Sequence, residues 1–184
     1  MTRNQALEVL NQYVKQDNML KHSLASEAVM RAIARRLNQD VEKWGLAGLL
    51  HDVDVEVTNA DALIHGQKAI DILTPLGIDS DVIDAISMHN ECSSKAQRST
   101  MFHFALAAGE TITGLITATA LVYPDKKLAS IKTKSVVKRM KEKNFAASVK
   151  RESILECELI GISINEFAEI SIAAMLEISD QLGL

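Results

Sequence analysis

The stretch Leu46-Ala47-Gly48-Leu49-Leu50-His51-Asp52 joins an apolar run to an adjacent imidazole and carboxylate. An apolar run of this kind is typical of a buried helix. We therefore predict a helix over 41–50 that carries His51 and Asp52 at its C-terminal end. Imidazole and carboxylate side chains held on a rigid element are the donors that a metal centre needs. The stretch thus predicts a helical core with a site inside it.

The composition of the whole chain favours helices. Of the 184 residues, 47% are hydrophobic but only 4% are aromatic, and two are prolines. Ala, Leu, Ile, Met, Glu and Lys dominate, which suits helices better than a sheet. Because no repeat, linker or low-complexity segment divides the chain, we predict an all-α, single-domain helical bundle over residues 1–184.

Apolar spacing and capping signals locate the other helices. Capping-box patterns begin at Thr2 and Ser163, and Ser80 is predicted to cap the helix that ends before His89. A polar loop is expected over 54–61. The predicted helices run from Thr2 through Val14, over 23–37, 41–50, 66–73 and 81–88, from Met101 to Pro124, and over 163–181.

A basic segment follows the long helix. Residues 126–151 hold ten lysines and arginines, half of the total in the chain, against a single acid. Two interpretations stay open: a solvated amphipathic helix, or a positive rim that attracts phosphate groups to the site. Under the second interpretation, Lys126, Lys127 and Lys134 are candidate substrate-binding residues.

Charge, cysteines and hydropathy exclude several classes of protein. The net charge is −4, whereas domains that coat nucleic acid are usually basic, so no nucleic-acid partner is expected. Cys92 and Cys157 give no disulfide framework, which favours a reducing cytoplasm. The N-terminus lacks the apolar core of a signal peptide. Residues 101–122 are long enough to span a bilayer, but Glu110 makes a span costly, so we expect a buried helix and no membrane contact. The oligomeric state stays open.

Four of the five histidines, one with a carboxylate neighbour, recur at about one per predicted helix: His22, His51-Asp52, His65 and His89. This order resembles the HD superfamily of metal-dependent phosphohydrolases, whose signature is a His, a His-Asp pair and a later Asp. Members with two metals add two histidines after the pair. The resemblance is closest to the small HDIG-type proteins and runs from residue 21 to at least residue 143. It implies an HD-type helical domain with a metal-site core over about 18–125, in which these five residues bind metal.

The last ligand of the family is an Asp in a helix of the form Ala-Ala-Asp-x-x-Thr-Gly-Leu-Ile. The corresponding segment here reads Ala107-Ala108-Gly109-Glu110-Thr111-Ile112-Thr113-Gly114-Leu115-Ile116. Aligning the Thr-Gly pair puts Glu110 in the place of the Asp. Glu keeps the charge and the oxygen donors but reaches further, so we predict Glu110 as the sixth ligand.

The donor set suggests a metal and a mechanism. Neutral imidazoles with carboxylates suit iron, manganese or zinc, whereas magnesium and calcium prefer oxygen ligands. Because Asp52 directly follows His51, we expect Asp52 to bridge two divalent ions and so to act in catalysis. Two ions about 3.5–4 Å apart hold a hydroxide and stabilise an in-line displacement at phosphorus. The resemblance therefore implies hydrolysis of a nucleotide or another small phosphate ester.

The acids that follow the pair, Asp54, Glu56 and Asp61, have two interpretations. A general acid or base for the reaction is one of them, with Asp54 as the candidate catalytic residue. The alternative is that all three only solvate the loop.

Two other functions stay open. The HD fold also houses di-iron oxygenases with the same type of ligand shell, and a non-catalytic sensor or scaffold could retain the fold. Activity with zinc or manganese separates a hydrolase from an oxygenase. An absence of bound metal in purified protein favours the non-catalytic module.

Overall fold

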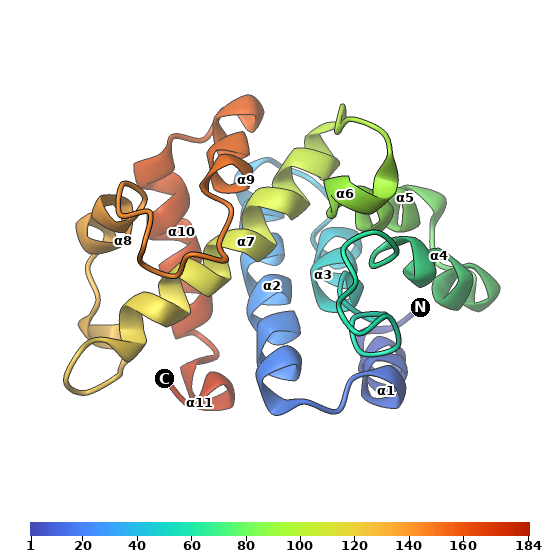
Figure 1. Ribbon diagram of the computed structural model, residues 1–184, viewed down its shortest axis with the longest axis horizontal. Coiled ribbons are helices and arrows are strands. Elements are labelled where there is room, and N and C mark those ends of the chain that lie inside the picture. The colour runs from blue at the N-terminus through green and yellow to red at the C-terminus, as the bar shows by residue number, and fades with distance from the viewer.

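The computed structural model describes residues 1–184, all of them in helices or in the turns and loops between helices. No β-strand is present, and the all-α prediction is confirmed (Figure 1). The helices, with η marking 3₁₀ helices, are α1 (Arg3–Tyr13), α2 (Asp17–Arg36), α3 (Val41–Leu50), α4 (Gln67–Leu73), η1 (Thr74–Leu76), α5 (Ser80–Met88), α6 (Glu91–Ser94), α7 (Met101–Leu121), η2 (Leu128–Ser130), α8 (Thr133–Arg139), α9 (Arg151–Leu155), η3 (Glu156–Ile160), α10 (Ile164–Leu176) and α11 (Ser179–Leu182).

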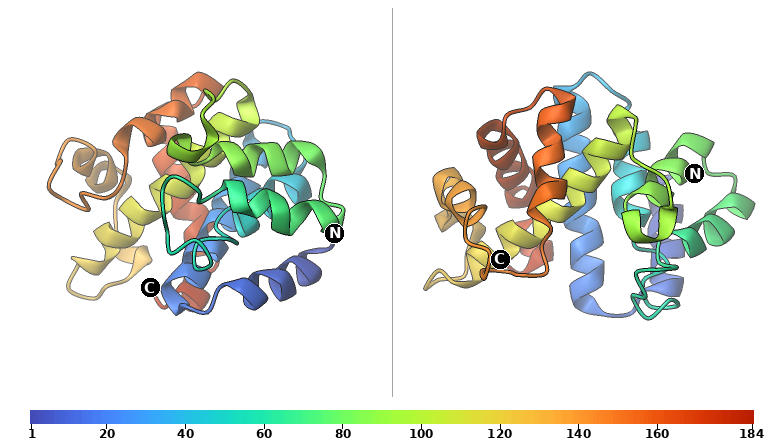
Figure 2. Two further views of the ribbon diagram at one scale, coloured as in Figure 1. Left: turned by 45° about the vertical axis from the view of Figure 1, so that its right-hand side comes forward. Right: turned by 45° about the horizontal axis from the view of Figure 1, so that its top comes forward.

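Helix α2 lies at the centre of the bundle and packs against α3, α7 and α10. Helix α7 crosses it in Figure 1 and stays beside it in both views of Figure 2. Two glycines allow these close approaches. A Cβ on Gly48 of α3 would lie 2.6 Å from the Ser26 carbonyl oxygen of α2, and one on Gly109 of α7 would lie 2.9 Å from Met30 Sδ. These contacts fix how the helices that carry the predicted ligands are placed on α2.

Two of the three predicted helix caps are present. The Thr2 side chain accepts from the amide three residues on, within a full capping box, and the Ser163 side chain accepts from the corresponding amide at the start of α10. The prediction for α5 was wrong. Asp79 is its N-cap residue, and Ser80 is already the first residue of the helix.

The C-terminal helix predicted over 163–181 is divided into two. Helix α10 ends at Leu176, and Ile178 has φ −117° and ψ 18°, outside the α-helical region. Helix α11 then packs against α2. The chain therefore turns after α10 and packs a second helix against α2.

The basic segment is mostly irregular rather than one amphipathic helix. Within 126–151, the α-helical part that precedes α9 is α8, which spans seven residues and buries Val136. The solvated-helix interpretation therefore holds for α8 alone.

Helix α7 is the single continuous helix that is long and apolar enough to cross a membrane. Of its most apolar window, 61% is buried inside the protein. Its Glu110 also lines a pocket of the bundle. This pattern is consistent with the core helix of a soluble protein.

Candidate metal centre

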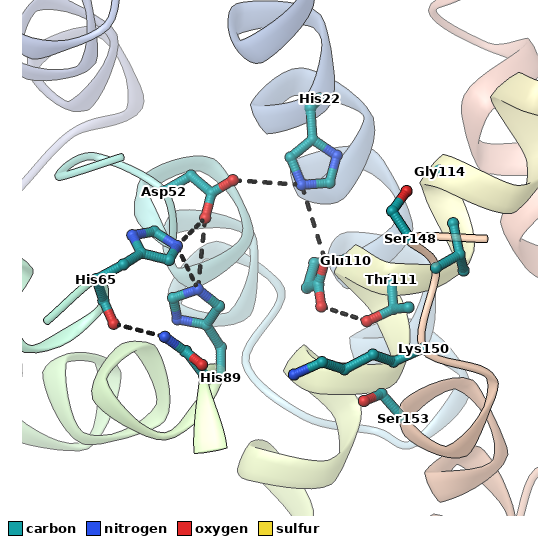
Figure 3. A pocket seen from close by; sticks show the side chains of 12 residues that line it. His22, Asp52, His65, His89, Glu110, Thr111, Gly114, Ser148, Lys150 and Ser153 are labelled. Carbon is teal, nitrogen blue, oxygen red and sulfur yellow. Dashed lines mark hydrogen bonds and ion pairs between the residues drawn. The ribbon is translucent and has the colours of Figure 1, made fainter. Parts of the chain in front are cut away.

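The six predicted ligands come from separate parts of the fold. They are His22 of α2, His51 at the C-terminal end of α3, Asp52 in the turn after it, His65 in the turn before α4, His89 at the C-terminal end of α5, and Glu110 of α7. Five of them face one another around one pocket (Figure 3), and the sixth, His51, is completely buried beside them. The cluster therefore exists only when the bundle is packed.

Asp52 lies at the centre of the cluster and is 7% exposed. Its Oδ1 is 3.0 Å from His65 Nε2 and 3.4 Å from the Nε2 atoms of His51 and His89. Its Oδ2 is 3.5 Å from His22 Nε2. Two groups of three donors share this carboxylate: His22, His51 and Asp52 form one, and Asp52, His65 and His89 form the other. The arrangement is compatible with a metal site on either side of Asp52.

Two of the histidines are oriented by backbone carbonyls at the end of their own helix. His51 Nδ1 lies 2.9 Å from the Gly48 carbonyl oxygen, and His89 Nδ1 contacts the Ile86 carbonyl oxygen. A carbonyl oxygen can only accept, so each Nδ1 carries a proton and donates it. In the neutral form of each ring, Nε2 then presents its lone pair to the cluster.

Side chains orient the other two histidines. Thr113 donates its hydroxyl proton to the Glu110 carbonyl, so the Thr113 oxygen accepts from His22 Nδ1 at 3.0 Å. His65 Nδ1 lies 2.8 Å from Asp54 Oδ1. Partners of these kinds orient metal-binding histidines in proteins and fix which nitrogen is free to bind.

The Nε2 atoms lie close to one another. His22 Nε2 is 3.1 Å from His51 Nε2, and His65 Nε2 is 3.1 Å from His89 Nε2. Nitrogen atoms this close together can bind the same cation once each ring presents its lone pair. Four imidazoles with carboxylates are donors that zinc, iron and manganese accept. The residues present therefore fit a divalent transition metal.

Burial and neighbouring charges set the protonation of the cluster. Burial lowers the pKa of His51 to about 3, so this ring is neutral at pH 7. Burial also acts to lower the pKa of His65, but hydrogen bonds to Asp52 and Asp54 outweigh it and raise this pKa to about 10. Burial acts to raise the pKa of Asp52, yet the electrostatic interaction with the adjacent His51 ring and hydrogen bonds with His65 and His89 hold this pKa well below its usual value.

We predict that metal loading at pH 7.5 releases at least one proton. With a pKa of about 10, the His65 ring is protonated in the metal-free protein, and a histidine must lose that proton to bind metal. The apparent metal affinity should therefore rise with pH between 7 and 9. Calorimetric titrations in buffers of different ionisation enthalpy measure the released protons directly. A binding heat that is independent of the buffer would contradict this prediction.

Glu110 lies on the His22 side of the pocket. Its Oε2 is 3.8 Å from His22 Nε2, and its Oε1 accepts a hydrogen bond from the Thr111 hydroxyl. Burial raises the pKa of Glu110, although the charges of His22 and His89 oppose the change. Glu110 is in neither group of close donors, so its role as the sixth ligand stays a prediction.

Two substitutions separate a ligand from a structural acid at this position. If Glu110 binds metal, Glu110→Asp should keep metal binding, whereas Glu110→Gln should weaken it about tenfold or more, because a neutral amide is a poorer donor to a divalent cation. Metal content after dialysis, measured by mass spectrometry, gives the comparison. Full metal content in Glu110→Gln would remove this residue from the site.

Asp54 lies behind the cluster and not in the pocket. It is fully buried, and its Oδ2 accepts from the amides of Gly66 at 2.8 Å and Ala69 at 3.0 Å. The prediction of Asp54 as a catalytic acid or base is therefore corrected: with Oδ1 on His65, this carboxylate orients the imidazole and has no path to a substrate. Glu56 likewise accepts from two backbone amides, away from the pocket.

The lysines chosen from the sequence do not reach this pocket. Lys126, Lys127 and Lys134 are exposed and do not line it. Another lysine of the same segment, Lys150, does line it, together with Ser148, Ser153 and other residues. This part of the segment reaches the site because α9 packs against α7, which no local sequence signal indicates.

The pocket in front of the cluster has a volume of about 300 Å³. A more apolar hollow of about 480 Å³ lies between α2, α7 and the C-terminal residues, and shares His22 and Gly114 with the pocket. A ligand larger than a phosphate ion therefore has room beside the cluster.

Comparison with protein families agrees with this geometry. The family described as "HD domain" matches residues 19–151, a range that includes all six predicted ligands. The chain belongs to the HD domain family. The resemblance drawn from the histidines and the His51-Asp52 pair is thereby confirmed, and with it the expectation of a site suited to divalent metal.

Among curated proteins, the chain is similar to Ribonuclease Y of Nitratidesulfovibrio vulgaris, strains DP4 and Hildenborough. Each is 41% identical to it over 78 residues. The matched part covers 40% of this chain but only 14% of either relative. No solved structure matches the chain.

Proposed function

We propose that this HD domain protein is a metal-dependent phosphohydrolase that uses two divalent ions and acts on a nucleotide or another small phosphate ester. The observation that carries the proposal is the sharing of Asp52 between two groups of imidazole donors. A carboxylate common to two ions is suited to a centre that acts on both the entering and the leaving oxygen at phosphorus. Membership of the HD domain family supports the same proposal.

His22, His51 and Asp52 would hold one ion, and Asp52, His65 and His89 the other. When bound, the ions supply an activated water and offset the charge that develops on the phosphoryl oxygens. The water oxygen joins phosphorus, the ester P–O bond breaks, and the alcohol leaves with a proton.

The chain's own residues keep the donors ready for that role. The carbonyls of Gly48 and Ile86 and the carboxylate of Asp54 orient three imidazoles, so little reorganisation is needed when metal binds. Burial keeps His51 neutral. A pocket of about 300 Å³ favours a small phosphorylated partner over a membrane or a long nucleic acid.

The test is an assay of the wild-type protein and His51→Ala after reconstitution with manganese, zinc or ferrous iron. We expect hydrolysis of at least one phosphate ester in a panel with manganese or zinc, lost in His51→Ala. Turnover that needs iron and consumes dioxygen, without phosphate release, would favour the di-iron oxygenase. A protein that binds no metal and shows no turnover would favour a sensor or scaffold.

A further inference from the structure

One wall of the pocket carries polar groups that have no partner within the protein. Figure 3 shows Ser148, Lys150 and Ser153 on one chain segment, across the pocket from Asp52 and His65. The Lys150 side chain reaches from this segment into the pocket, and its ammonium group forms no ion pair with any carboxylate. We call these three residues the 148–153 wall.

Ser153 adds a hydroxyl to the wall. The residue is 7% exposed, and its hydroxyl makes no hydrogen bond within the chain. A serine hydroxyl on a helix can bond to the carbonyl four residues earlier, as that of Ser171 does to Phe167. For Ser153 that carbonyl belongs to Val149, and Arg151 already donates to it at 2.7 Å. The Ser153 side chain lines the pocket, where its hydroxyl is accessible to a ligand.

Arg151 also holds the irregular backbone that precedes the wall. Its guanidinium donates to the carbonyls of Glu142, Phe145, Ala146 and Val149. One of these residues, Ala146, has a φ of +44°, a conformation that a non-glycine residue adopts only when its surroundings enforce it. Arg151 is therefore a positioning residue that fixes the wall against the pocket.

A second set of hydrogen bonds joins the wall to the side of the pocket that carries the predicted ligand His89. Glu156 directly follows α9, and its carboxylate accepts from Arg98 at 2.6 and 2.8 Å. Arg98 also donates to the carbonyls of Met88 and His89 at the end of α5. The segment that carries Lys150 and the helix that carries His89 are thus tied through one buried guanidinium.

We propose that the 148–153 wall binds the phosphate oxygens of the substrate that do not contact metal, an inference that rests on the proposed function. The wall would thereby select phosphomonoesters. One ammonium and two hydroxyls match an oxyanion, since charged donors form the stronger bonds to phosphate. A monoester brings two negative charges and three terminal oxygens, whereas a diester brings one charge and two terminal oxygens. The added positive charge of Lys150 therefore favours the monoester.

Binding of inorganic phosphate to the manganese-loaded protein, followed by calorimetry, tests the wall without relying on turnover. Lys150→Met should weaken binding about tenfold, and Ser153→Ala a few-fold, the ranges expected for loss of one charged or one neutral hydrogen bond. Lys143→Met, an exposed lysine of the same segment that does not line the pocket, is the matched control and should bind as the wild type does. Equal affinities in Lys150→Met and Lys143→Met, or no phosphate binding by the wild type, would overturn the proposal.

Selectivity is measured with p-nitrophenyl phosphate and bis(p-nitrophenyl) phosphate, which share one leaving group. In Lys150→Met the ratio of kcat/KM for the monoester to that for the diester should fall about tenfold, the effect of one lost charged contact. Arg151→Lys keeps the positive charge but loses the planar guanidinium that donates to four carbonyls. This variant should also weaken phosphate binding, while its helix content stays that of the wild type. An unchanged ratio in Lys150→Met would contradict selection by the wall. Failure of the proposed function differs from this outcome, since the wild type would then hydrolyse neither ester.

Discussion

Asp52→Ala is expected to abolish paired metal binding and to lower kcat/KM for phosphate esters by about a thousandfold or more, equivalent to about 4 kcal/mol of transition-state stabilisation. The physical reason is that Asp52 is the single carboxylate within 3.5 Å of all four imidazoles. No neighbouring side chain can replace it between the two donor groups. Metal content by mass spectrometry and steady-state kinetics measure the two effects.

Asp84→Ala is the matched control for this experiment. Asp84 also contacts a histidine, His103, at 2.7 Å, but that pair lies away from the pocket. The control should retain the metal content and activity of the wild type. Two metals per chain in Asp52→Ala would show that Asp52 does not bridge the ions.

Asp54→Asn is expected to lower metal affinity by about 10- to 100-fold, the range observed when a partner of a metal-binding histidine is removed. The Asp54 carboxylate accepts from two backbone amides and faces His65 Nδ1. An asparagine has one acceptor oxygen, so its NH₂ group must face at least one of these donors. The His65 ring then loses its orientation, and a buried donor loses its partner.

Glu56→Gln separates this effect from a general loss of stability. Glu56 also accepts from two backbone amides, those of Lys15 and Gln16, but it contacts none of the predicted ligands. Its variant should bind metal as the wild type does. Competition titrations with a chromophoric chelator give both affinities, and an unchanged value in Asp54→Asn would rule out the orienting role of Asp54.

Local sequence signals predict the bounds of a helix correctly where those bounds depend on that helix alone. Helix α3 has the predicted bounds, because its apolar run follows Asp40, whose side chain caps the first turn. The division between α10 and α11 was missed, since it depends on packing of α11 against α2. Periodicity within one helix cannot reveal a contact with a distant one.

The residues of the candidate site were likewise predictable only in part. The order of histidines and carboxylates that the chain shares with the HD family identified the four histidines and Asp52, which the fold brings together. It did not distinguish Asp54 as an orienting carboxylate, because the amides that bind it lie 12 and 15 residues away. Nor did charge alone select Lys150 among ten basic residues, since only the packing of α9 on α7 brings that lysine to the pocket.

Anomalous diffraction from crystals of the manganese-loaded protein tests the central claim most directly, because it locates the metal independently of turnover. We predict two anomalous peaks about 3.5–4 Å apart, one between Asp52, His22 and His51 and the other between Asp52, His65 and His89. A protein that binds manganese elsewhere, with no peak at Asp52, would contradict the account.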